Sequence, residues 1–339
     1  MERIISGEPV PAHLRGAVIA LGNFDGFHLG HQAVVARAVE RARHEGRPAI
    51  VATFDPHPIR LFQPDAAPFR LTTLDQRERL FAEAGADAML VFRFTRELAA
   101  KSAEDFVALL AGDFGAAGVV TGEDFTFGRG RSGTVAVLQH LGADYSLTAQ
   151  AVAPILDESG AVISSSRIRE ALRAGDCATA TRLLTRPFAI QGTVIHGDKR
   201  GRTIGFPTSN MEMGKYVRPA YGIYAVRVRL PDGRMLGGAA NLGIRPTFAP
   251  PRELLETFIF DFSGDLYGQT IEVSLIGPSA LLRKRDAPDR AMRSCGPLWI
   301  RPGIVCVAAI QQGAGRRKFT KFTTRGRELP LPCAFRQSV

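Results

Sequence analysis

Residues 22–31 bring together residue types that suit the chemistry of a phosphate chain. They read Gly-Asn-Phe-Asp-Gly-Phe-His-Leu-Gly-His and follow a short apolar run at residues 17–21. His28 and His31 are three positions apart, so at the start of a helix both imidazoles face the same way. Free backbone N–H groups at a helix start favour an anion, and Gly30 lets the backbone approach it closely.

The same segment therefore predicts a site for a nucleoside triphosphate, in which charge that builds on the α-phosphate is stabilised. Its lining is expected to include Gly22, Asn23 and Phe24. The alternative interpretation is that the two histidines only cap a helix.

A second phosphate-binding segment is predicted at residues 164–169, which read Ser-Ser-Ser-Arg-Ile-Arg. Ser164, Ser165 and Ser166 are good caps for a helix N-terminus, and capping alone is the alternative interpretation. With Arg169 on the first turn, the hydroxyls would also clamp phosphates.

Between these two segments, residues 122–128 follow an apolar run that predicts a strand. Ligands of open α/β sheets bind at the carboxyl ends of such strands. Asp124 could accept hydrogen bonds from a ligand, and Phe125 or Phe127 could stack on its ring. The alternative is a turn that carries two core aromatics.

Residues 196–210 form a glycine-rich and cationic cluster in the second half of the chain. They are not a Walker A loop, because no Gly-Lys-Ser/Thr closes them. Glycines beside cations still suit phosphates, and the candidate residues are Gly197, Lys199 and Gly201. A basic surface hairpin is the alternative.

Three further residues could complete a phosphoryl-transfer site. Thr208 and Asn210 are two positions apart, so in an extended segment their hard oxygen atoms share one face and suit Mg²⁺. Glu256 opens a later predicted strand and could act as general base for a hydroxyl. The alternative for Glu256 is a solvated surface carboxylate.

Two architectures must position these residues. In the first half, strand-like runs at residues 17–21, 48–54, 88–92 and 118–121 alternate with helical stretches, which predicts a parallel α/β sheet of Rossmann-like type. From residue 188, closely spaced alternating strands at 189–196, 222–230, 256–262 and 270–276 predict a small antiparallel β-barrel. The expected domains are residues 1–185 and 186–277, followed by an atypical tail at 278–339.

Composition limits the class of protein. The net charge is +10, and residues 278–339 hold 13 Lys/Arg and 3 Asp/Glu, so the rest of the chain is neutral. No apolar run reaches the ~20 residues that span a bilayer, which predicts no membrane association. The opening residues lack the apolar core of a signal peptide, so a cytoplasmic protein is expected. The four cysteines lie far apart, which argues against a zinc site.

The motifs, taken together and in order, resemble the bacterial bifunctional riboflavin kinase/FMN adenylyltransferase family (FAD synthetase). Besides those above, FDPHP at residues 54–58, NLGIRPTF at 241–248 and ETFIFDFSGDLYG at 256–268 carry the resemblance, which covers roughly residues 1–277. It implies two reactions. A C-terminal barrel phosphorylates riboflavin with ATP to give FMN, and an N-terminal module transfers AMP from a second ATP to FMN, giving FAD and pyrophosphate.

The resemblance also implies roles for individual residues. His28 and His31 would stabilise the adenylyl transition state, Asp124 would contact nucleotide or metal, and Ser164, Ser165 and Arg169 would hold phosphates. In the kinase, Thr208 and Asn210 would bind Mg²⁺, Glu256 would activate the hydroxyl, and Asn241 and Arg245 would lie near the flavin or its flap.

The chain departs from this family after residue 277. The family has an acidic and apolar segment there that ends in a helix packed on the barrel, whereas this tail is basic and lacks periodicity. Such a change fits a divergent or frame-shifted C-terminus, disordered or loosely attached, and predicts a weakened kinase beside an intact adenylyltransferase. The alternatives are a monofunctional FMN adenylyltransferase, a nucleic-acid binder that acts through the tail, and a class I aminoacyl-tRNA synthetase relative. The body gives no sign of a nucleic-acid partner, and the sequence does not indicate an oligomeric state.

Overall fold

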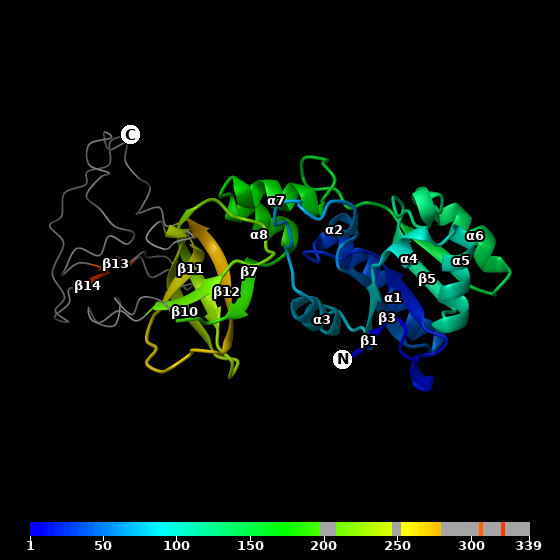
Figure 1. The fold of residues 1–339 in the computed structure, drawn as a ribbon, viewed down its shortest axis with the longest axis horizontal. Coiled ribbons are helices and arrows are strands. Elements are labelled where there is room, and N and C mark those ends of the chain that lie inside the picture. Colours follow the sequence, from blue (N-terminus) through cyan, green and yellow to red (C-terminus); the bar gives the residue numbers. More distant parts are fainter. Residues whose placement is uncertain (197–207, 246–251, 279–304, 308–319, 323–339) are drawn as a thin grey trace. The chain divides into compact units, whose positions relative to one another are not determined.

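The computed structural model describes residues 1–196, 208–245, 252–278, 305–307 and 320–322 (Figure 1). One compact unit consists of Met1–Ile244 and Glu253–Pro278 and carries every candidate site residue that the structure describes, except Arg245. The second unit contributes two short antiparallel strands, β13 (Val305–Val307) and β14 (Thr320–Phe322). Within the described residues, no helix is long and apolar enough to cross a membrane.

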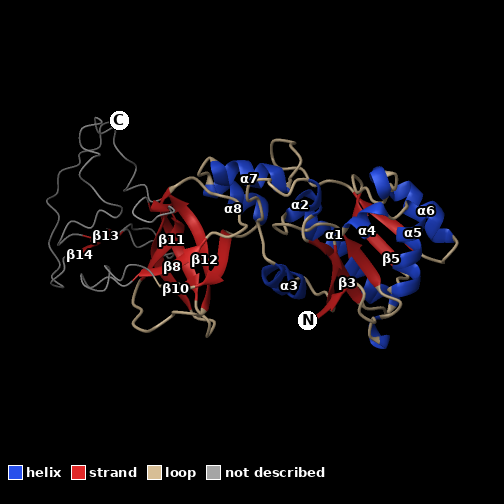
Figure 2. Ribbon diagram, in the orientation of Figure 1, coloured by secondary structure: helices blue, strands red, loops and turns tan. Residues whose placement is uncertain are grey.

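A six-stranded parallel sheet organises the first half of the chain (Figure 2). Its strands are β1 (Glu2–Ile5), β2 (Val18–Leu21), β3 (Ala49–Asp55), β4 (Ala88–Arg93), β5 (Gly118–Gly122) and β6 (Thr148–Val152). Their spatial order is β1-β4-β3-β2-β5-β6, so β2 lies between β3 and β5. The chain moves from β2 to one side and returns to the other, which makes the carboxyl end of β2 the topological switch point where ligands bind in such sheets.

Helices surround this sheet and bury both of its faces. They are α1 (Leu29–Glu45), α2 (Pro58–Phe62), α3 (Leu74–Glu83), α4 (Arg96–Ala100), α5 (Ala103–Ala108) and α6 (Val135–Ala143), with short turns η1 (Ala12–Leu14), η2 (Leu109–Asp113) and η3 (Arg129–Arg131). Because side chains alternate along a strand, Val18 and Ala20 pack with α1 and α3 residues, whereas Ile19 and Leu21 pack with residues of α5 and α6. Burial on both faces explains the continuous apolar run of β2.

Two helices, α7 (Ser165–Arg173) and α8 (Cys177–Leu184), lead to a second sheet that is antiparallel. Its strands are β7 (Phe188–Thr193), β8 (Thr208–Glu212), β9 (Gly222–Arg229), β10 (Met235–Arg245), β11 (Arg252–Ile259) and β12 (Thr270–Pro278). The order is β7-β12-β9-β10-β11-β8, and a bridge between Ile195 and Asn210 joins the two edges of the sheet. The sheet therefore curls into a half-barrel around its own apolar core.

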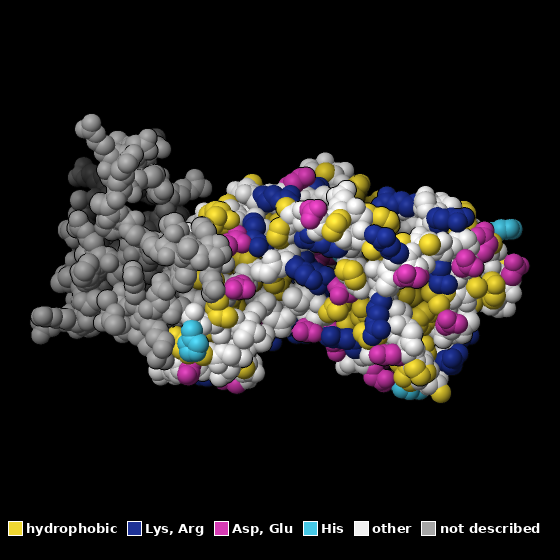
Figure 3. All heavy atoms as spheres, viewed as in Figure 1, with side chains coloured by type: hydrophobic (Ala, Val, Ile, Leu, Met, Phe, Trp, Pro, Cys, Tyr) yellow, Lys and Arg dark blue, Asp and Glu magenta, His cyan; other side chains and the backbone are white. Residues whose placement is uncertain are grey.

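The fold class expected from the sequence is thus confirmed in both halves. The domain boundaries at residues 185 and 277 stay predictions. The expected disorder of the tail concerns residues that lie mostly outside the described part of the chain. On the face in Figure 3, basic and acidic side chains are interspersed over the described residues.

Candidate functional sites

The two histidines of the first motif lie together at the start of α1, directly after the carboxyl end of β2. His28 is the N-cap of the helix, and its Nδ1 accepts a hydrogen bond from the backbone N–H of His31 at 3.4 Å. The two rings stack with their centroids 3.6 Å apart, and Phe24 meets the His31 ring edge-on at 5.3 Å. The predicted pairing of the imidazoles on one side of the helix start is what the structure shows.

Both histidines are held in their neutral form. Burial, with a smaller effect of the Arg169 and Arg186 charges, lowers the pKa of His28 to about 4. Burial and the neighbouring His28 lower the pKa of His31 well below its usual value. Because Nδ1 of neutral His28 accepts a hydrogen bond, its Nε2 carries the proton and can donate to a ligand. Nδ1 of His31 is buried and has no hydrogen-bond partner among the described residues.

Two glycines allow close packing around these rings. A Cβ atom on Gly30 would lie 3.2 Å from Cε1 of His28, so the imidazole rests against the bare helix backbone. A Cβ atom on Gly22 would lie 3.0 Å from Cζ of Phe24. Asp124 is exposed and follows β5, which pairs with β2, so the Asp124 segment and the predicted nucleotide segment leave neighbouring strands.

Asp25, which the sequence analysis did not single out, is the buried hub of this region. Its carboxylate accepts hydrogen bonds from the backbone N–H groups of Leu71 at 2.9 Å and Thr72 at 3.0 Å. It also pairs with the guanidinium of Arg169 at 2.7 Å. The hydroxyl of Ser165 donates to the Asp25 carbonyl at 2.8 Å, so α7 is fastened to the β2–α1 turn. The only sign of this role in the sequence is that Asp25 is the single acidic residue in residues 22–31, whose other residues suit an anion.

The serine segment starts α7 as its composition predicts. Ser164 is the N-cap and accepts from the Arg167 N–H, while Ser166 is exposed. The guanidinium of Arg169 already has protein partners. Its Nε donates to the Phe69 carbonyl at 2.8 Å, and the group also forms the ion pair with Asp25. In this structure Arg169 therefore holds the protein part of the site in place, whereas its predicted contact with phosphate stays a prediction.

Arg77 is a second buried residue that the sequence did not point to. From α3, its guanidinium donates to the Asn23 carbonyl at 3.1 Å and to the Thr53 hydroxyl at 2.7 Å. The Thr53 hydroxyl itself donates to the Asn23 carbonyl at 2.8 Å. Arg77 and Thr53 thus both hold the backbone of the β2–α1 turn at the Asn23 carbonyl, while the Asn23 side chain is exposed.

The aromatic residues of these segments mostly serve the core. Phe24 is buried against Phe81, and Phe127 is only 6% exposed and packs on Phe106 at 5.4 Å between ring centroids. Phe125 is partly buried and stacks on Phe127. For Phe127 the structure thus corresponds to the alternative interpretation of a core aromatic, because its ring has little surface left for a ligand.

The half-barrel brings the three predicted kinase residues together. Asn210 of β8 is the direct cross-strand partner of Glu256 in β11, and Thr208 lies two residues along on the same face. Asn210 is 3% and Glu256 4% exposed, so Glu256 is not a solvated surface carboxylate. The Asn210 Oδ1 atom is buried without a hydrogen-bond partner in the described part of the chain. A cavity of about 40 Å³, lined in part by Thr208, Asp265 and Tyr267, opens beside them.

The remaining candidates are less completely placed. Asn241 lies in β10 opposite Ile223, and Arg245 ends that strand. Gly197, Lys199 and Gly201 fall outside the described residues.

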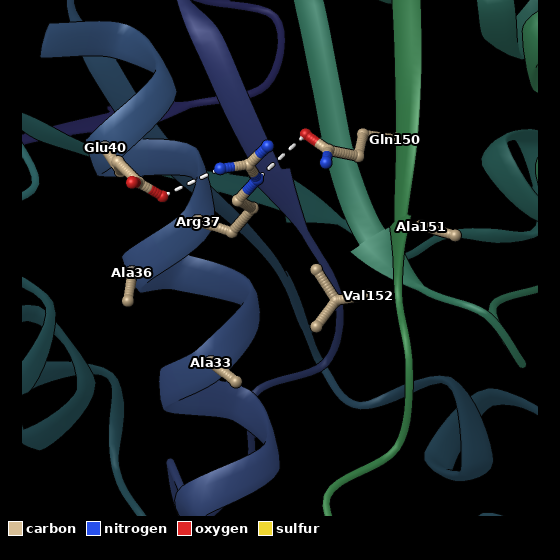
Figure 4. Close-up of a pocket in the computed structure, with 7 residues that line it drawn as sticks. All are labelled: Ala33, Ala36, Arg37, Glu40, Gln150, Ala151 and Val152. Atoms are coloured by element: carbon tan, nitrogen blue, oxygen red, sulfur yellow. Dashed lines mark hydrogen bonds and ion pairs between the residues drawn. The ribbon is translucent and has the colours of Figure 1, made fainter. Parts of the chain in front are cut away.

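A larger hollow of about 580 Å³ lies beside α1 and β6, and Figure 4 shows its lining. Arg37 spans it, donating to Glu40 at 2.8 Å and to Gln150 at 3.2 Å. Neither histidine lines it, so it is distinct from the site at the start of α1.

Comparisons with known proteins match both halves of the chain. The FAD synthetase family matches residues 10–167, and the riboflavin kinase family matches residues 184–284. A bifunctional riboflavin kinase/FMN adenylyltransferase from Escherichia coli (strain K12) is 42% identical over 261 residues, which cover 77% of this chain and 83% of that protein. The protein of the same name from Bacillus subtilis (strain 168) is 37% identical over 263 residues, or 76% and 82% of the two chains.

One solved structure supports the fold of the two halves together. A crystal structure described as a macrolide-efflux protein from Streptococcus pneumoniae aligns with a TM-score of 0.72 and 31% identity, covering 86% of this chain and 95% of that one.

Proposed function

The chain belongs to the family of bifunctional riboflavin kinases/FMN adenylyltransferases, and on that premise we propose which of its residues perform each reaction. The riboflavin kinase makes FMN, and the FMN adenylyltransferase converts FMN to FAD. The observation that carries the proposal is the stacked, neutral pair of His28 and His31 at the start of α1.

In adenylyl transfer, a phosphate oxygen of FMN attacks the α-phosphorus of ATP, and the bond to the β-phosphate oxygen breaks to release pyrophosphate. Charge grows on oxygens around the α-phosphorus as this happens. The Nε2–H of His28 and the free backbone N–H groups of the first turn of α1 are proposed to donate hydrogen bonds to these oxygens. Gly30 leaves the helix backbone open to the phosphates, and Asp124 contacts the nucleotide or its metal. Ser164, Ser165 and Arg169 flank the phosphates.

In the kinase, Glu256 is proposed to take the proton of the ribityl 5′-hydroxyl as that oxygen attacks the γ-phosphate of ATP. The residues beside it fit Mg²⁺, because Asn210 offers a buried carbonyl oxygen without a partner among the described residues and Thr208 offers a hydroxyl. Bound there, Mg²⁺ would neutralise charge on the ATP phosphates. Asn241 and Arg245 are proposed to lie near the flavin. Both reactions are proposed to occur in the cytoplasm, without a nucleic-acid partner.

Two matched variants test the assignment in one assay. Purified full-length protein is incubated with ATP and Mg²⁺, starting from riboflavin or from FMN, and FMN and FAD are resolved by chromatography. His28→Ala should accumulate FMN from riboflavin and make little FAD. Glu256→Gln should leave riboflavin untouched yet convert added FMN to FAD. The assignment fails if either variant loses the other activity instead, or if both keep normal rates.

The tail suggests that the two activities are unequal. The match to the riboflavin kinase family ends at residue 284, and the basic residues that follow differ from the segment expected to cover the barrel. We therefore propose a weakened kinase beside an intact adenylyltransferase. The measurement is kcat/KM for riboflavin phosphorylation in this protein and in the Escherichia coli relative. Equal values would refute the proposal.

A further inference from the structure

Arg186 lies at the junction between the two halves of the chain, between the end of α8 and the start of β7. Its guanidinium donates hydrogen bonds to three backbone carbonyls, those of Gly26 at 2.6 Å, Phe27 at 3.1 Å and Leu184 at 3.0 Å. Leu184 ends α8, so the cation also faces the negative end of that helix. Burial lowers the pKa of Arg186 to about 10, which leaves it charged at neutral pH.

The two distant carbonyls belong to the turn that presents the histidines. Gly26 has φ 89° and Phe27 has φ 44°, and the next residue is the N-cap His28. A residue with a side chain rarely adopts a positive φ unless its surroundings hold it there. Because Arg186 binds the carbonyls on both sides of the Gly26–Phe27 step, it fixes the direction in which the chain enters α1.

Gln32 closes the same network from the other side. Its side-chain amide donates to the Phe27 carbonyl at 3.0 Å and to the Thr185 hydroxyl at 2.8 Å. Gln32 directly follows His31 on the first turn of α1. The turn, the helix start and the junction are therefore joined by two side chains, Gln32 and Arg186, which share the Phe27 carbonyl.

We propose that Arg186 is a positioning residue for adenylyl transfer. It holds the turn of Gly26 and Phe27 so that the His28 side chain is correctly placed to contact the α-phosphate of ATP. Arg186 lies outside the match to the FAD synthetase family, which ends at residue 167, and inside the match to the riboflavin kinase family. The adenylyltransferase site is thus completed by a residue of the kinase part of the chain. This inference rests on the proposed role of His28.

The test uses full-length Arg186→Gln and Arg186→Lys proteins and measures both activities of each sample. Gln keeps a polar side chain but cannot span three carbonyls, whereas Lys keeps the charge with fewer fixed donors. Misplacing a catalytic group by about 1 Å costs about 100-fold in rate, so Arg186→Gln should lower kcat for FMN adenylylation about 10- to 100-fold. Its KM values and its riboflavin kinase rate should stay within about twofold of wild type, and Arg186→Lys should fall between Gln and wild type.

Arg182→Gln is the matched control, because Arg182 is exposed on α8 and the one side-chain hydrogen bond that it makes within the described residues is to its neighbour Thr179. It should leave both activities unchanged. Gln32→Leu combined with Arg186→Gln should lower kcat by less than the product of the two single effects, since both donors act on one carbonyl.

Several outcomes would overturn the inference. They are equal losses of both activities in Arg186→Gln, a loss confined to KM, and an unchanged kcat. His28→Ala, assayed alongside, distinguishes a failure of the proposed role of His28 from a failure of the inference about Arg186. If His28→Ala keeps full adenylylation, the proposed function fails. If His28→Ala is inactive while Arg186→Gln is normal, only the inference about Arg186 fails.

Discussion

Replacing Asp25 with asparagine should strongly destabilise the N-terminal half of the protein. The Asp25 side chain is 6% exposed and accepts from two backbone N–H groups, and the side chain of its partner Arg169 is only 12% exposed. Asparagine keeps the shape but removes the charge, so a buried guanidinium loses its counter-charge. Breaking a buried pair in this way costs about 3–5 kcal/mol.

Thermal unfolding followed by far-ultraviolet circular dichroism measures this loss. At about 2–4 °C per kcal/mol for a domain of this size, the midpoint should fall by about 6–20 °C. The control is Glu40→Gln, which removes an ion pair with Arg37 in which Glu40 is 70% exposed. That pair should contribute about 0–1 kcal/mol.

A double variant sharpens the argument. Asp25→Asn combined with Arg169→Gln removes both charges and should cost less than the two single losses added together, because neither charge is left buried alone. A midpoint for Asp25→Asn that lies as close to wild type as that of the Glu40 control would refute the reasoning. Strict additivity in the double variant would do the same.

Three further predictions follow from the described sites. Burial lowers the pKa of His28 to about 4, whereas the unfolded value is about 6.5, so the unfolded chain binds more protons between these values. The free energy of unfolding should then decrease by up to about 3 kcal/mol as the pH falls from 6.5 to 4, and thermal midpoints of His28→Gln should depend less on pH. Gly30→Ala, whose Cβ would press on His28, should lower kcat for FAD formation about tenfold or more without lowering the thermal midpoint. Asn210→Ala should raise the Mg²⁺ concentration needed for riboflavin phosphorylation about 10- to 100-fold while adenylylation stays normal, as titrations of each activity will show.

The parts of the fold that could be predicted are those with a local signal. The central strands β2 and β4 carry continuous apolar runs because both faces of the sheet are covered. His28 and His31 could be paired because a spacing of three places them together on any helix. A small barrel could also be predicted from the strand spacing, but the pairing of Asn210 with Glu256 could not, because it depends on β8 and β11 lying side by side.

Edge strands lacked such a signal. β1 and β6 lie at the two edges of the parallel sheet, and neither carries a continuous apolar run. β10 was missed because it contains glycines, yet one is required. A Cβ on Gly238 would lie 2.6 Å from the carbonyl oxygen of Phe258 on the neighbouring strand. Contacts such as Asp25 with Arg169 or Arg186 with Gly26 span more than 140 residues, so no local pattern reveals them.

At Asn23, Gly26 and Phe27 the β2–α1 turn is held through its own main chain, and this has a consequence for how the site can be varied. Arg77 binds the carbonyl of Asn23, and Arg186 binds those of Gly26 and Phe27. Every amino acid supplies a carbonyl, so these bonds place no demand on the side chain that the turn shows to solvent. Exposed Asn23, which is predicted to line the nucleotide site, should therefore accept many different side chains without a change in the shape of the turn.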